Sequence, residues 1–273
     1  GDPILVKFGG DSVSGTYNGD GDVDCSSFAS NSVENRAVTI AFNGQQYTTA
    51  NVVDFQYYTL PTLSSSAPSF APVRGGAVVV VTGSGFVAAS GGVGGSYVQC
   101  RFGSSVVSGN FVSSSEVNCP SSPAGLSAGV VTLSVTMDKE DFTTGINFDV
   151  YDLPAVTSIS PMSGPLGGST TVTVTGTGFF DTSVFKAQWT GVGGSVSCTR
   201  VSATEAQCLS PAKGSDGTVP FGITVDDAAT SVSEVFTSGG GVDFQYYTMP
   251  TVLTLDPPLG VKEGGTAVTI AGS

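Results

Sequence analysis

The chain has 273 residues, which is enough for two or three domains. Its formal net charge of −13 disfavours nucleic acid and anionic membrane surfaces as partners, because both attract clustered Lys and Arg side chains. The chain contains no histidine, which excludes histidine-activated nucleophiles and histidine-bound zinc. Hydrophobic residues make up 40% of the chain, yet no apolar run reaches the length of a membrane helix. Together with abundant glycine and alternating valine and threonine, this predicts an all-β protein without membrane insertion in this segment.

Residues 18–24 are the first distinctive segment along the chain. Oxygen-bearing side chains stand at every second position, as at the start of a calcium loop: Asn18, Asp20, Asp22 and Asp24. However, Val23 and Ala29 occupy the positions where an EF-hand needs glycine and a bidentate glutamate. The segment therefore predicts an acidic, solvent-exposed hairpin beside Cys25, with a calcium site as the alternative and no other cofactor.

Residues 53–61 and 242–250 carry almost the same peptide, and residues 146–154 carry a diverged third copy. An internal repeat of this kind is typical of tandem modules, and here each module would end with an aromatic strand and a proline. Strand alternation turns one tyrosine of each pair outward, where its ring could pack on the next module or simply fill its own strand. The residues expected at these joints are Tyr58, Pro61, Tyr151, Pro154, Tyr247 and Pro250.

A second repeated feature is a glycine pair that leads into a strand of alternating residues, in residues 75–86, 167–179 and 264–273. A proline-rich segment precedes each pair. A cysteine-bearing segment follows the first two copies, at residues 119–123 and 208–212. The common order of these features indicates one kind of module used repeatedly.

In this order the motifs resemble the IPT/TIG domain, an immunoglobulin-like β-sandwich of plexin-type and fibrocystin-type ectodomains, bacterial surface proteins and some transcription factors. The resemblance implies tandem immunoglobulin-like β-sandwiches with an incomplete module at each terminus. Residues 61–153 and 154–249 would be complete sandwiches. Residues 1–60 would be the C-terminal part of a sandwich and residues 250–273 the N-terminal part of one.

The two incomplete modules continue one another in sequence. Residues 7–9 match residues 101–103, which lie in the middle of a complete module, and residues 250–273 stop inside its first glycine-rich turn. Placing the C-terminal segment before the N-terminal one restores the family pattern. We therefore expect the missing half to come from an identical chain, head to tail, or from the continuation of a longer repeat polypeptide. The alternative is a fragment whose ends are arbitrary.

The resemblance also implies a disulfide between neighbouring strands of each complete module. The pairs would be Cys100 with Cys119 and Cys198 with Cys208. Cys25 has no mate in its own module, because Val6 occupies the aligned position, so it is either a buried thiol or an intermolecular cross-link. Disulfides indicate an extracellular or cell-surface protein, whereas reduced thiols would indicate a cytosolic one.

These features predict a non-enzymatic protein. The first hypothesis is the structural repeat unit of an extracellular filament or surface appendage, assembled head to tail. The alternative is the stalk or ligand-binding ectodomain of a cell-surface receptor or adhesin, and a third hypothesis is an accessory domain of a carbohydrate-active enzyme. No Asn-x-Ser/Thr sequence occurs, so any glycans would be O-linked.

Overall fold

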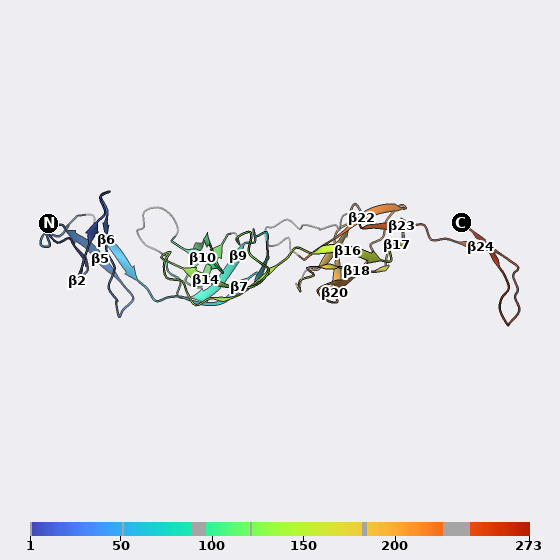
Figure 1. The fold of residues 1–273 in the computed structure, drawn as a ribbon, viewed down its shortest axis with the longest axis horizontal. Coiled ribbons are helices and arrows are strands. Elements are labelled where there is room, and N and C mark those ends of the chain that lie inside the picture. The colour runs from blue at the N-terminus through green and yellow to red at the C-terminus, as the bar shows by residue number, and fades with distance from the viewer. Residues whose placement is uncertain (1, 51, 89–96, 121, 182–184, 226–240) are drawn as a thin grey trace. The chain divides into compact units, whose positions relative to one another are not determined.

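The computed structural model describes residues 2–50, 52–88, 97–120, 122–181, 185–225 and 241–273 (Figure 1). Every regular element in these residues is a β-strand, which confirms the all-β prediction. The described residues include no helix long and apolar enough to cross a bilayer. The chain divides into two compact units, Gly1–Val150 and Tyr151–Ser273.

Residues 61–153 form a sandwich of two sheets around one core. The first sheet contains, in spatial order, β12 (Asn110–Ser113), β13 (Glu116–Cys119), β9 (Val79–Ser84) and β7 (Thr62–Ala67). The second contains β11 (Ser105–Ser108), β10 (Gln99–Phe102), β14 (Gly129–Thr136), β15 (Ile146–Tyr151) and β8 (Phe70–Pro72). Alternate residues of both sheets point inward, so Val79 and Val81 of one sheet and Phe102 and Leu133 of the other are fully buried.

Residues 154–249 repeat this architecture as one sheet that folds over on itself. Its strands, in spatial order, are β16 (Ala155–Ser160), β18 (Thr171–Thr177), β21 (Glu205–Leu209), β20 (Val196–Arg200), β19 (Lys186–Trp189), β22 (Gly217–Thr224), β23 (Asp243–Tyr247) and β17 (Ser163–Pro165). The sheet is continuous because β20 pairs with both β21 and β19. In the core, the Trp189 ring meets the rings of Phe221 and Phe244 edge to face, with centroids 5.0 and 6.1 Å away.

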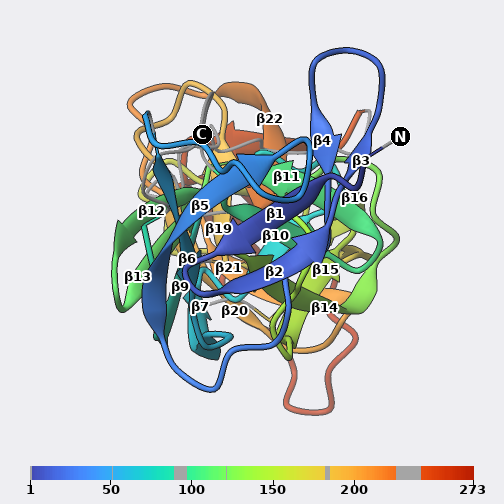
Figure 2. The ribbon, with the colours of Figure 1, turned by 90° about the vertical axis from the view of Figure 1, so that its left-hand side faces the viewer.

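Residues 1–60 form one sheet and a separate hairpin. Figure 2 faces this sheet, which contains β2 (Asp11–Ser14), β1 (Leu5–Phe8), β5 (Glu34–Ala41) and β6 (Val53–Tyr57). The hairpin contains β3 (Thr16–Tyr17) and β4 (Val23–Asp24). The sheet repeats the order of β11, β10, β14 and β15, and the hairpin corresponds in sequence order to β12 and β13.

Residues 250–273 form a hairpin of two antiparallel strands, β24 (Val252–Asp256) and β25 (Thr269–Gly272). It corresponds to the first strands of each complete module. Close backbone approach supports this equivalence, because a Cβ atom on Gly83, Gly176 or Gly272 would collide with a carbonyl oxygen on, or directly before, the partner strand. All residues of this hairpin are exposed.

The buried indole provides a test of the core of residues 154–249. We expect Trp189→Ala to lower the free energy of unfolding by about 3–5 kcal/mol, because it removes the ring against which Phe221 and Phe244 pack. Denaturant unfolding would measure this. The control Val201→Ala alters an exposed residue and should change stability by less than about 0.5 kcal/mol. Similar losses in both variants would contradict the proposed core.

Candidate functional site

Three equivalent tyrosines stand where the last strand of a module meets the next segment of chain: Tyr58, Tyr151 and Tyr247. The residue before each belongs to its own module; Tyr246, for instance, is fully buried and donates its hydroxyl to the Pro211 carbonyl at 3.0 Å. Burial raises the pKa of Tyr246 to about 12. Strand alternation thus points Tyr58 and Tyr247 to the opposite side of the strand from Tyr57 and Tyr246.

Tyr58 reaches from the end of the first module to a turn of the second. Its hydroxyl donates a hydrogen bond of 2.8 Å to Oδ2 of Asp138, a half-buried residue just after β14. The other carboxylate oxygen, Oδ1, accepts bonds from the Thr136 hydroxyl at 2.7 Å and from the backbone amides of Glu140 and Asp141 at 2.9 and 2.8 Å. Asp138 therefore both orders its own turn and anchors the tyrosine.

The electrostatics of this contact favour the charged carboxylate and the neutral phenol. Partial burial acts to raise the pKa of Asp138, but hydrogen bonds from Thr136, the two amides and Tyr58 outweigh it, so its pKa is lowered. Burial and the neighbouring carboxylate raise the pKa of Tyr58. The bond is therefore charge-assisted across the neutral pH range.

Tyr151 makes a different contact at the equivalent position. Its ring is buried and stacks on Phe180, with centroids 5.0 Å apart and planes inclined by 16°. The neighbouring backbone is close, since a Cβ on Gly178 would lie 3.3 Å from the Cα of Pro154. Tyr247, which follows the second complete module, is 37% exposed. Of the predicted joint prolines, Pro61 and Pro154 are buried and Pro250 is exposed.

Two disulfides lie within the complete modules. Cys100 is bonded to Cys119, and this bond joins β10 of one sheet to β13 of the other, not two neighbouring strands as expected. Cys198 is bonded to Cys208 on the adjacent strands β20 and β21. Closing loops of 19 and 10 residues would contribute about 2–3 kcal/mol each by restricting the unfolded chain.

Cys25 is a free thiol just after β4, and it is exposed, so the expectation of a buried thiol was wrong. Partial burial, followed by the charge of Asp24, raises its pKa. The position aligned with its missing partner is Val6 on β1, as the sequence indicated. An intermolecular cross-link through Cys25 stays a prediction.

The acidic segment forms the β3–β4 hairpin, and its predicted ligands are exposed: Asn18, Asp20, Asp22 and Asp24. Asn18 accepts a hydrogen bond from the amide of Asp20 at 3.2 Å, as in a tight polar turn. Within the part of the chain that the structure describes, no three His, Cys, Asp or Glu side chains gather in a way that could hold a metal ion. Calcium binding here stays a prediction.

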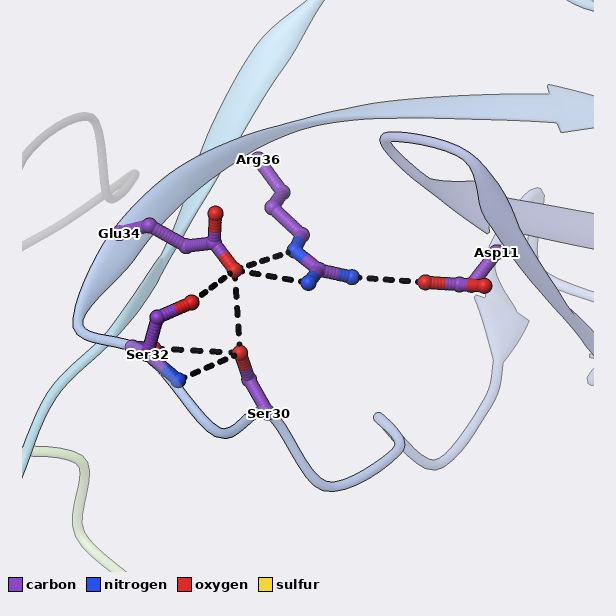
Figure 3. Close-up of polar contacts among 5 residues, drawn as sticks. All are labelled: Asp11, Ser30, Ser32, Glu34 and Arg36. Atoms are coloured by element: carbon purple, nitrogen blue, oxygen red, sulfur yellow. Dashed lines mark hydrogen bonds and ion pairs between the residues drawn. The ribbon is translucent and has the colours of Figure 1, made fainter.

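Sequence reasoning missed a polar cluster on the first sheet (Figure 3). Arg36 forms ion pairs with Asp11 at 2.8 Å and with Glu34 at 2.7 Å. The same Glu34 oxygen accepts hydrogen bonds from the hydroxyls of Ser30 and Ser32 at 3.0 and 2.7 Å. Hydrogen bonds from Ser32, Arg36 and Ser30 lower the pKa of Glu34. Glu34 and Arg36 have opposite charges and stand two positions apart on β5, so they lie on the same face of the strand. This spacing is the signal in the sequence that could have suggested the cluster.

Comparison with known proteins identifies the modules. The sequence profile of the IPT/TIG domain matches residues 61–150 and 154–246. The chain is 27% identical to Plexin-A4 of Danio rerio over 159 residues, which is 58% of this chain and 8% of the relative. It is 29% identical to Plexin-A2 of Mus musculus over 179 residues, which is 61% of this chain and 8% of that relative. The chain thus spans less than a tenth of the length of these curated relatives.

Among solved structures, the full extracellular region of Plexin A4 aligns with 92% of this chain and 22% of its own, at 20% identity and a TM-score of 0.46. The profile match confirms the resemblance inferred from the repeated motifs.

The hydrogen bond at Tyr58 gives a pH-dependent prediction. We expect Tyr58→Phe to lower the free energy of unfolding by about 1 kcal/mol near neutral pH, because it removes one partly exposed, charge-assisted bond. Asp138 has a lowered pKa, so its contribution is present above its unfolded pKa and is lost as the pH falls through the folded value. The difference between wild type and variant should therefore shrink in acid, as measured by urea unfolding over a pH series.

A matched control for this experiment is Tyr247→Phe, which changes the equivalent, more exposed tyrosine. It should leave stability unchanged at every pH. A Tyr58→Phe effect that is absent at neutral pH, or that grows in acid, would contradict the hydrogen bond.

Proposed function

The chain belongs to the IPT/TIG domain family, and we propose that it forms part of the stalk of a cell-surface receptor or adhesin ectodomain. In this role, consecutive β-sandwiches act as spacers that hold other domains away from the cell surface. The disulfides, which persist in oxidising compartments, and the similarity to plexin extracellular regions indicate an extracellular or cell-surface location.

The observation that supports a spacer best is the contact between Tyr58 and Asp138. It links the end of one module to a turn of the next across a connection that contains Pro61. Proline restricts the backbone, and a charge-assisted hydrogen bond adds a fixed point beyond it. A spacer needs this kind of joint, because a flexible linker would let neighbouring modules reorient independently.

A structural role also fits the chemistry of the chain. Immunoglobulin-like IPT/TIG modules in plexin ectodomains are non-enzymatic, and this chain lacks histidine altogether. Its charge of −13 keeps the surface soluble and self-repelling, which suits an exposed stalk and disfavours a DNA-binding role.

The repeat unit of an extracellular filament is a more specific hypothesis, and the plexin similarity favours the receptor stalk over it. O-linked glycans and calcium in the acidic hairpin are compatible with a surface stalk and stay predictions. An accessory domain of a carbohydrate-active enzyme has no residue-level support in the described modules.

The stalk proposal predicts a stiff connection between residues 1–60 and residues 61–150. In ¹⁵N relaxation measurements, both segments should tumble with the same rotational correlation time. Tyr58→Phe should shorten the correlation time of residues 1–60 alone, because it releases the anchor on Asp138. Tyr247→Phe serves as the control and should have no effect there. Independent tumbling already in the wild-type chain would contradict a spacer built on this joint.

A further inference from the structure

The two disulfides occupy different places in their modules. Cys119 and Cys208 are equivalent, because each lies on the strand that pairs with the glycine-flanked strand of its module. Their partners are not equivalent. The pairing of β10 with β14 and of β19 with β22 shows that Ala187 takes the position of Cys100 in the second complete module. The partner of Cys208 is instead Cys198, on the next strand, β20.

The bond between Cys100 and Cys119 is closed off from solvent. Both residues are fully buried, and the bond crosses the core between the two sheets. The backbone of Gly109 lies directly against one of the sulfurs, because a Cβ atom there would be 3.1 Å from Sγ of Cys100 and 2.8 Å from a methyl carbon of Val98. Thiol–disulfide exchange requires a thiolate to reach one of the two sulfurs. This bond therefore opens only when the module itself unfolds.

The bond between Cys198 and Cys208 is covered on one side only. Cys208 is 2% exposed, whereas Cys198 is half-buried. Ser197 and Thr199, the neighbours of Cys198, are exposed, so β20 lies at the surface of the module. Since Cys198 is the more exposed partner, its sulfur is the one that a thiol in solution meets first.

The backbone around this second bond keeps the two cysteines together without it. Strands β20 and β21 are antiparallel neighbours, and Cys198 lies directly opposite Cys208 in their ladder. Two further residue pairs extend the ladder, and the amide of Val201 donates a hydrogen bond of 2.9 Å to the carbonyl of Glu205 at its closed end. The bond can therefore open and form again while the strands stay paired.

Strand β20 is also the place where an open bond would change the module. Among the described strands it joins the two halves of the folded sheet, because it pairs with β21 on one side and with β19 on the other. Its ladder with β19 consists of Lys186 opposite Ser197 and Ala187 opposite Val196. Without the disulfide, these short ladders alone would hold the corner, and local opening of β20 would become easier.

We propose that the disulfide of Cys198 and Cys208 is a site of thiol–disulfide exchange in the folded protein, and that its substrate is a small dithiol in the surrounding solution. The disulfide of Cys100 and Cys119 is permanent under the same conditions. Exchange at β20 loosens one corner of residues 154–249 and leaves both sandwich cores folded. The proposal does not require the stalk role.

The exchange has two steps. A thiolate of the dithiol attacks Sγ of Cys198, the bond between the two cysteines breaks, and its electron pair leaves on Sγ of Cys208, which takes up a proton. The second thiolate of the dithiol then attacks the reagent sulfur of the mixed disulfide and releases Cys198 as a thiolate, which is protonated in turn. The protein disulfide gains two electrons and two protons, and the dithiol is oxidised to a disulfide.

Timed reduction of the folded 273-residue chain with dithiothreitol tests the proposal. Samples are quenched in acid, free thiols are alkylated, and trypsin cleaves after Arg101 and Arg200, so mass spectrometry reports all four cysteines on separate peptides. The bond of Cys198 and Cys208 should open faster than the bond of Cys100 and Cys119 by about tenfold or more, because only the first is reachable in the folded state. In concentrated guanidinium chloride the two rates should become similar.

A monothiol identifies the sulfur that is attacked. After brief exposure of the folded chain to glutathione, the mixed disulfide should be on the peptide that contains Cys198. Free Cys25 is alkylated before any reduction and serves as the internal standard for labelling.

Hydrogen–deuterium exchange measures the structural consequence. When only the bond of Cys198 and Cys208 is open, the amides of β20 should exchange faster, and those of β18 and β22 should keep their protection. The double variant Cys198→Ser, Cys208→Ser should reproduce this pattern without reductant. The matched control Cys100→Ser, Cys119→Ser should leave the exchange of β20 unchanged.

Three results would overturn the proposal. The first is equal reduction rates for the two bonds in the folded chain. The second is loss of protection throughout β18 and β22 when the bond of Cys198 and Cys208 opens, which would mean that exchange requires unfolding. The third is glutathione attached first to Cys208. The wild-type reduction rates decide the matter even where a serine variant does not fold.

Discussion

The structure depends on one constraint: the apolar face of each sheet must be covered by a second sheet. In residues 61–153 and 154–249 this condition is met, and the facing side chains of Val81, Phe102 and Val174 are fully buried. A typical apolar side chain gains about 1.5–3 kcal/mol when it leaves water, so a sandwich is stable only when both layers are present. The exposed apolar faces of residues 1–60 and of the C-terminal hairpin follow from the same rule.

The joints between modules use a different kind of interaction. At the end of a closing strand, the tyrosine at the position of Tyr58 contacts residues outside that strand, and its partner differs between copies. Tyr58 donates a hydrogen bond to the carboxylate of Asp138, while the ring of the equivalent Tyr151 stacks on the ring of Phe180. The same position of the repeat thus supports a hydrogen bond in one copy and ring stacking in another.

Much of this organisation could be predicted from the sequence. The repeated closing peptide and the glycine-flanked strands are local patterns that identify the module, and the match of residues 7–9 with residues 101–103 predicts that the first sheet corresponds to the later strands of a module. The partners of Tyr58 and Arg36 could not be predicted. Asp138 is distant in sequence and lies in a turn, and the Arg36 cluster depends on the register between β1, β2 and β5. Such contacts follow from tertiary placement, which local patterns do not encode.

Hydrogen–deuterium exchange on the intact chain tests the central claim most directly. The account predicts slow exchange at every concentration for the amides of β9 and β18, because they lie inside complete sandwiches. The amides of β25 and β4 should exchange much faster, because no second sheet covers these strands in the part of the chain that the structure describes. Protection of β25 as strong as that of β18 would contradict the claim that coverage by a second sheet is what stabilises each strand.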